Sequence, residues 1–210
     1  MYRERGLSAE FWAEPLNAIT NAAFLIAALL AWNLAARRRV TTSLTYGLLL
    51  LVGTIGVGSF CFHTIPNSFT MWLDVGPIAL FQVLFLWIAT NRMLGLSATA
   101  SSAIVVGVVG SSFALFPIYQ PLNGSLFYLP SLLAMVTIGF AWSRRGASEP
   151  YLLVIAAGIF LIAITARSLD QQVVWRFGTH FLWHMLNGVV VYLAIRSWIV
   201  SVAQECETET

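Results

Sequence analysis

Charge is scarce in this sequence. Only 10% of its 210 residues are charged, and lysine is missing, so all eleven basic residues are arginines. Soluble domains carry about 25% charged residues. With 59% hydrophobic residues and a mean hydropathy of +0.80, the chain has too few polar groups to cover a surface in water. The composition excludes a soluble globular protein, and a dispersed net charge of +2 excludes a nucleic-acid partner.

Cysteine is scarce as well. The two cysteines are Cys61, inside an apolar run, and Cys206, in the polar C-terminal tail. Two cysteines in such different settings do not make a disulfide framework. We expect both to be unpaired.

Long apolar runs fill the rest of the chain. A helix needs about 20 apolar residues to cross a bilayer, whereas a barrel strand needs about 9–11, so these runs predict helices. We expect an all-α integral membrane protein with one seven-transmembrane helix bundle over residues 1–203 and an acidic tail over residues 204–210. The expected spans cover residues 15–36, 44–63, 69–89, 98–116, 125–142, 151–165 and 180–202, with a Pro- and Gly-containing break from Pro117 to Gly124 between the fourth and the fifth.

The arginines predict how the bundle is oriented. Six of them follow the first, third and fifth spans, and four lie on the opposite side. The positive-inside rule then places the N-terminus outside and the C-terminus in the cytoplasm.

Few ionisable residues lie within the expected spans, and such residues are functional candidates by default. Besides Glu14, at the entrance of the first span, they are four residues: His63, at the end of the second span, Asp74, early in the third, and His180 and His184, at the start of the seventh. The predicted topology brings all four to the outer ends of three helices at a similar depth. We therefore expect them to converge on one site.

The spacing of these residues predicts a metal centre. His180 and His184 are four residues apart, so they share one face of a helix. With His63 they would leave one position of a tetrahedral Zn²⁺ open for water, whose pKa the ion lowers toward about 7. Asp74 could then take the proton, and the Ser59 hydroxyl, one turn before His63, could donate a hydrogen bond to an oxyanion.

Structural roles are open alternatives for each residue taken alone. A histidine near the membrane interface often serves as a polar cap, and His180 and His184 could pack with Trp183 at the bilayer boundary. Ser59 could be a small residue that lets two helices approach closely. From the residues alone, the prediction is an intramembrane metal site whose reaction stays open.

Two further polar groups have structural interpretations. Arg167 and Asp170 are interpreted as a solvated pair near the last outer loop. Asn17, Thr20 and Asn21 recur at helical spacing on the first span and could bond to neighbouring helices.

Four segments together resemble the alkaline ceramidases. They are the entrance Glu14–Asn21, the segment Gly58–His63, the segment Leu73–Ile78 and the closing His-x-x-x-His of His180–His184. The alkaline ceramidases belong to a superfamily of seven-helix membrane hydrolases that also contains the progestin and adipoQ receptors and the GPI-lipid remodelling proteins. The resemblance implies catalytic Zn²⁺ on the three histidines, with Asp74 and Ser59 assisting, and hydrolysis of the amide of an N-acyl sphingoid lipid to a long-chain base and a fatty acid.

The resemblance also implies a Ca²⁺ site, for which Glu14 and Glu4 are the candidate ligands, although the fuller acidic cluster of the eukaryotic members is missing here. The compact chain suggests a bacterial-type member in the inner membrane, with its site in the periplasmic leaflet half and a membrane lipid as substrate. Two alternatives stay open. One is an esterase or lipid-remodelling hydrolase acting on another lipid, and the other is a seven-helix receptor with a structural zinc.

Overall fold

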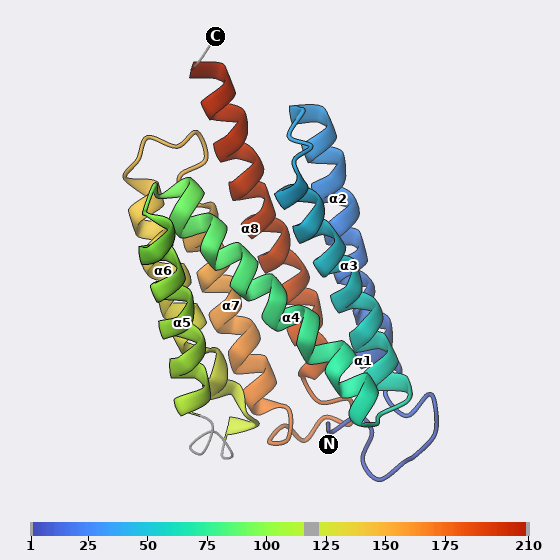
Figure 1. The fold of residues 1–210 in the computed structure, drawn as a ribbon. Coiled ribbons are helices and arrows are strands. Elements are labelled where there is room, and N and C mark those ends of the chain that lie inside the picture. Colours follow the sequence, from blue (N-terminus) through green and yellow to red (C-terminus); the bar gives the residue numbers. More distant parts are fainter. Residues whose placement is uncertain (1, 116–121, 209–210) are drawn as a thin grey trace.

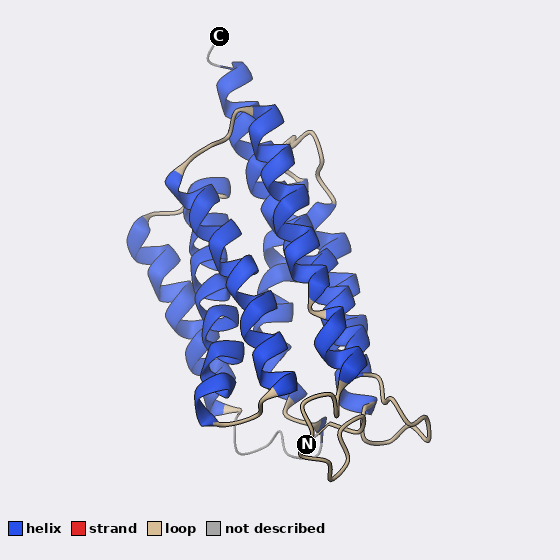
Figure 2. Ribbon diagram, turned by 90° about the vertical axis from the view of Figure 1, so that its right-hand side faces the viewer, coloured by secondary structure: helices blue, strands red, loops and turns tan. Residues whose placement is uncertain are grey.

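Helices make up the regular structure of the described chain. The computed structural model describes residues 2–115 and 122–208, and these residues contain no strand (Figures 1 and 2). The elements are α1 (Pro15–Thr20), α2 (Ala22–Arg38), α3 (Ser43–Thr64), α4 (Ser68–Ile88), the π-helix η1 (Ala89–Met93), α5 (Ala98–Ala114), the 3-10 helix η4 (Ser125–Tyr128), α6 (Leu129–Ser143), α7 (Leu152–Leu169) and α8 (His180–Thr208).

The prediction of an all-helical chain suited to a bilayer is confirmed. Six helices are long and apolar enough to cross a membrane, with α1 and α2 together forming the first of them. The fourth expected span is shorter than the others, because α5 has 17 residues. The last residue of that expected span and most of the break before the fifth lie outside the described residues.

Two helices run further than expected. α7 continues to Leu169, four residues beyond its expected end, so Arg167 belongs to the helix. α8 continues to Thr208 and takes in most of the expected tail, whose last two residues lie outside the described part of the chain. Cys61 and Cys206 are both free, as expected.

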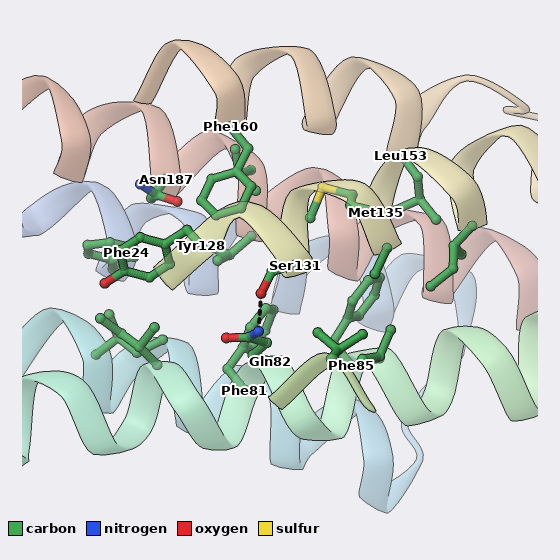
Figure 3. Close-up of a pocket in the computed structure, with 18 of the residues that line it drawn as sticks. Phe24, Phe81, Gln82, Phe85, Tyr128, Ser131, Met135, Leu153, Phe160 and Asn187 are labelled. Atoms are coloured by element: carbon green, nitrogen blue, oxygen red, sulfur yellow. Dashed lines mark hydrogen bonds between the residues drawn. The ribbon is translucent and has the colours of Figure 1, made fainter. Parts of the chain in front are cut away.

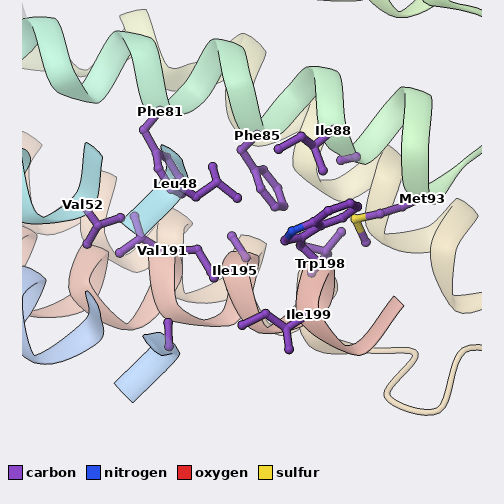
Figure 4. Close-up of a cluster of buried hydrophobic side chains, with 14 of the residues drawn as sticks. Leu48, Val52, Phe81, Phe85, Ile88, Met93, Val191, Ile195, Trp198 and Ile199 are labelled. Carbon is purple, nitrogen blue, oxygen red and sulfur yellow. The ribbon is translucent and has the colours of Figure 1, made fainter. Parts of the chain in front are cut away.

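α8 is the central helix of the bundle. In its most apolar stretch 61% of the residues are buried, compared with 28–44% in the other candidate spans. Its inner face meets α3, α4 and η1 in a cluster of buried side chains (Figure 4). The cluster includes Leu48, Val52, Phe81, Phe85, Met93, Val191, Ile195, Trp198 and Ile199.

The outer faces of the helices are apolar too. Large hydrophobic side chains that are more than half exposed include Leu29 on α2, Leu50 on α3, Phe69 on α4 and Val106 on α5. Such surfaces are unfavourable in water and are expected where lipid is the solvent.

The turn between α3 and α4 joins two helices that lie very close together. Asn67 and Thr70 form a capping box that begins α4 only three residues after α3 ends. Further along, Gly58 of α3 lies directly against the Leu73 carbonyl of α4, and a β-carbon would not fit there. Within α4 the N–H of residue 77 would normally bond that carbonyl, but residue 77 is a proline and has no N–H. This close approach aligns Ser59 with Asp74.

Candidate metal centre

Three histidines meet at the end of the bundle that carries the N-terminus. His63 comes from the last turn of α3, and His180 and His184 come from the first turns of α8. One ring nitrogen of each lies within 4.8 Å of the others, and the three residues are 0%, 1% and 2% exposed. The expected convergence of the three is therefore present, and the cluster could hold a metal ion.

His63 is oriented by a carboxylate from the entrance of the first helix. Its Nδ1 lies 2.5 Å from Oε2 of Glu14, while its Nε2 is buried and has no hydrogen-bond partner among the described residues. A carboxylate on the far nitrogen of a histidine is the usual device that fixes a metal-binding ring. It leaves Nε2 directed at the cluster.

His184 is held in a similar way by a hydroxyl. Its Nδ1 lies 3.1 Å from Oγ1 of Thr20, and that hydroxyl also donates to the Leu16 carbonyl at 2.6 Å. Because a hydroxyl has a single hydrogen, Thr20 accepts from Nδ1 of His184. The hydrogen then sits on Nδ1, and Nε2 is left with a lone pair for a metal.

His180 is positioned through its backbone. Oδ1 of Asp170 accepts from the N–H groups of Thr179 and His180 at 2.8 and 2.9 Å, which caps α8 from the end of α7. Oδ2 accepts from the N–H of Arg3 at 3.0 Å. The Tyr2 ring stacks on the His180 ring with centroids 3.7 Å apart.

The interpretation of Asp170 and Arg167 as a solvated pair is wrong. Asp170 is fully buried, and no ion pair joins it to Arg167. The short loop after α7 folds back under the bundle, so the carboxylate meets backbone N–H groups instead of water. Its role is to begin α8 where the histidines start.

The donor set fits a zinc ion. Nδ1 of His180 is buried without a partner among the described residues, as is Nε2 of His63. Buried ring nitrogens without partners are costly unless something binds them. Three neutral imidazoles and an open position are typical of catalytic zinc.

Glu4 and Glu14, for which the resemblance implies Ca²⁺ binding, are both bound by other groups of the protein. Glu4 accepts from the backbone N–H groups of Leu16 and Asn17 at 2.8 and 2.9 Å and so caps α1. Burial raises the pKa of the Glu4 carboxyl, and these two donors act against the shift. Glu14 binds the Arg5 guanidinium at 2.5 Å as well as His63.

Arg5 therefore fills the position of a cation beside Glu14. Its guanidinium also donates to the carbonyls of Ser8, Glu10 and His63, at 3.3, 3.4 and 2.7 Å. Burial raises the pKa of Glu14, but its hydrogen bonds with His63, Asn17 and Arg5 outweigh burial and hold the pKa below its ordinary value.

Ser59 and Asp74 line a small cavity beside the cluster. The same wall includes His180, His184 and Arg167. The structure thus brings all five residues predicted for the zinc chemistry to one end of the bundle, on α3, α4 and α8.

A larger apolar cavity adjoins the small one. Both are lined by Phe24, Ile55, Ile78, Tyr128 and Trp183. The larger cavity continues between α4 and α6, where Gln82 donates to Ser131 (Figure 3). Its walls are almost entirely hydrophobic.

Comparison with protein-family models gives no match, and comparison with curated proteins gives none either.

Several residues at the site make contacts that the sequence does not predict. Thr20 is expected only to bond to a neighbouring helix, Glu14 is an ionisable candidate at the first helix entrance and a calcium ligand by resemblance, and Tyr2 and Arg5 have no predicted role. Buried charges next to the metal-ligand motif were the available signal, because an arginine or a carboxylate at such a position needs a partner.

Proposed function

We propose that the protein is a zinc-dependent intramembrane hydrolase. Its substrate would be a ceramide-like N-acyl sphingoid lipid, cleaved at the amide to a long-chain base and a fatty acid. The observation that carries the proposal is the buried histidine cluster, with two rings oriented from behind, opening on a cavity that holds a carboxylate and a hydroxyl.

The chain's own residues supply the remaining chemistry. A zinc ion on the three histidines supplies a water of lowered pKa as nucleophile. Asp74 takes the proton of the attacking water and passes it to the amine nitrogen as the carbon–nitrogen bond breaks. Ser59 donates a hydrogen bond to the carbonyl oxygen as charge builds on it.

The apolar cavity supports a substrate with a long acyl chain. A chain lying between α4 and α6 would bring its polar end to the walls shared with the small cavity. The amide then meets Asp74 and Ser59, while the hydrocarbon stays out of water.

The proposal includes a topology. α5 would also cross the bilayer and bring the number of spans to seven. Its 17 residues reach about 25 Å, and local thinning of the bilayer accommodates a short helix. The arginine bias favours an outer N-terminus, and in a bacterial inner membrane the histidine cluster would then lie in the periplasmic leaflet half.

Metal analysis of purified protein beside three single variants tests the proposal. Wild type should hold about one Zn²⁺, and His63→Ala, His180→Ala and His184→Ala should each lose both metal and hydrolysis. Asp74→Asn should keep the metal and lose turnover. Full turnover by His180→Ala would overturn the assignment.

One matched substrate pair separates the amidase from the esterase alternative. A long-chain ceramide and an ester lipid with the same acyl group are offered to a single detergent-solubilised preparation. Faster release of fatty acid from the ceramide supports the amidase. Release from the ester alone would make the protein a zinc esterase.

A further inference from the structure

Arg167 places a positive charge on the wall of the small cavity. It lies in the last turn of α7 and shares that wall with Ser59, Asp74, His180 and His184. Three aromatic rings surround its guanidinium carbon, those of Tyr2 at 5.9 Å, Tyr128 at 5.7 Å and Trp183 at 5.3 Å. Such a cage holds a cation in place without neutralising its charge.

Among the side chains that the structure describes, none pairs with the guanidinium as a counter-ion, because no described carboxylate lies within 4.0 Å of it. One nitrogen, Nη1, donates to the Tyr2 hydroxyl at 3.3 Å, and Nε is buried with no partner. Arginine stays protonated in proteins, and Asp74, whose charge interacts with this half-buried guanidinium, forms no ion pair with it.

The charges around the cavity do not cancel. Arg167 contributes one positive charge, a zinc ion on the histidines would add two, and among the described residues that line this cavity Asp74 is the one carboxylate. The sum stays positive even when Asp74 is ionised. A neutral lipid head group would leave this excess uncompensated, whereas an anion would neutralise part of it.

We propose that Arg167 is an anion-binding residue, and that the natural substrate is an N-acyl lipid whose head group carries a carboxylate or a phosphate. This inference rests on the proposed function and concerns the head group of its substrate. Tyr128 and Trp183 line both cavities and also enclose Arg167. An acyl chain in the larger cavity therefore directs the head group toward the guanidinium, and guanidinium groups bind the oxygens of carboxylates and phosphates.

Binding to the metal-free full chain in detergent tests the inference without catalysis. The probes are N-palmitoylglycine and N-palmitoylethanolamine, which share the acyl chain and the amide and differ in a carboxylate against a hydroxymethyl group. Wild type should bind the anionic probe about 10- to 100-fold more tightly, measured from the rise of Tm with probe concentration. Equal binding of the two probes would overturn the inference.

Three variants separate anion binding from a structural role. Arg167→Gln should lose the preference for the carboxylate, and Arg167→Lys should keep part of it. Tyr2→Phe removes the hydroxyl that Arg167 binds but keeps the aromatic ring, so the preference should survive. If Arg167→Gln weakens both probes equally, the residue only supports the fold of this region. If Arg167→Gln does not fold, inorganic phosphate is added to wild type instead. Loss of the preference for the carboxylate probe would then support anion binding, and an unchanged preference would overturn it.

Hydrolysis by the zinc-loaded protein identifies the kind of anion and keeps the two proposals apart. The substrates are ceramide, ceramide 1-phosphate and N-palmitoylglycine. Faster turnover of either anionic lipid supports the inference and shows whether phosphate or carboxylate is preferred. Equal turnover of neutral and anionic lipids would overturn the inference and leave the hydrolase standing. No turnover of any of these three amides would overturn the amidase, while the binding experiment would still report on Arg167.

Discussion

Oε2 of Glu14 lies 2.5 Å from Nδ1 of His63, across 49 residues of sequence. The same carboxylate binds Arg5, whose guanidinium donates to the His63 carbonyl at 2.7 Å. The N-terminal segment therefore holds a candidate metal-ligand histidine at both its ring and its backbone. This arrangement makes the segment before the first helix part of the candidate metal centre.

Replacing Glu14 by glutamine should weaken zinc binding. The amide no longer attracts the hydrogen on Nδ1 with a full negative charge, and loss of such an orienting partner typically costs about 10- to 100-fold in affinity. Competition with a zinc chelator measures the change. Glu10→Gln is the matched control, because the Glu10 side chain is exposed, and it should bind zinc like wild type. Unchanged affinity in Glu14→Gln would show that the carboxylate does not orient the ring.

Replacing Arg5 by methionine should destabilise the protein. The side chains of Arg5 and Glu14 are 2% and 4% exposed, and removing one partner of a buried ion pair costs about 3–5 kcal/mol. Arg196→Met is the control, because its partner Glu149 and its own side chain are about a third exposed and the expected cost is about 1 kcal/mol or less. Thermal unfolding in detergent compares the two. The double variant, Arg5→Met with Glu14→Gln, should lose less stability than the two single variants lose together.

Adding Ca²⁺ should not stabilise the wild-type protein. The oxygens of Glu4 and Glu14 are bound by N–H groups of the chain, and Arg5 lies where a cation would bind. A Tm that stays constant as millimolar Ca²⁺ is added is the expected result. A Tm that rises with Ca²⁺ concentration would show that the ion displaces Arg5 and that the resemblance extends to calcium.

Replacing Asp170 by alanine should loosen the start of α8. Two N–H groups at the helix N-terminus lose their acceptor, at a cost of about 2 kcal/mol, and His180 loses the contact that fixes its backbone. Zinc affinity should fall together with Tm. Ser97→Ala removes the cap of α5 and should lower Tm without changing zinc affinity. Equal zinc affinity in the two variants would limit Asp170 to a capping role.

Adding a methyl group at Gly58 should disturb turnover while leaving the metal bound. The new β-carbon would meet the Leu73 carbonyl, so α3 and α4 must separate beside Asp74, at a cost of about 1–3 kcal/mol. Gly53→Ala, on the same helix, meets no atom within 4 Å and should be as stable as wild type or more so. Zinc content and ceramide turnover of both variants are compared. Normal turnover in Gly58→Ala would show that the spacing of the two helices is not critical.

Local features of the sequence were sufficient to predict the helices and the three histidines. The lengths of the apolar runs determine where a chain can cross a bilayer, and the scarcity of charge makes each ionisable residue inside a run conspicuous. His180 and His184 lie four residues apart on one helix, so their shared face follows from helical geometry alone. The predicted topology then brings His63 and Asp74 to the same end of the bundle.

Only the tertiary structure decided what surrounds the histidines. Glu14 reaches His63, Arg3 reaches Asp170 across 167 residues, and Arg167 ends among aromatic rings. These contacts depend on the path of the N-terminal segment and on how each helix is rotated about its axis. Neither leaves a periodic pattern in the sequence, because a single hydrogen bond between distant segments needs only one suitable residue at each end. The sequence by itself determined which residues could bind a metal, and the packing of the chain ends determined how those residues are held.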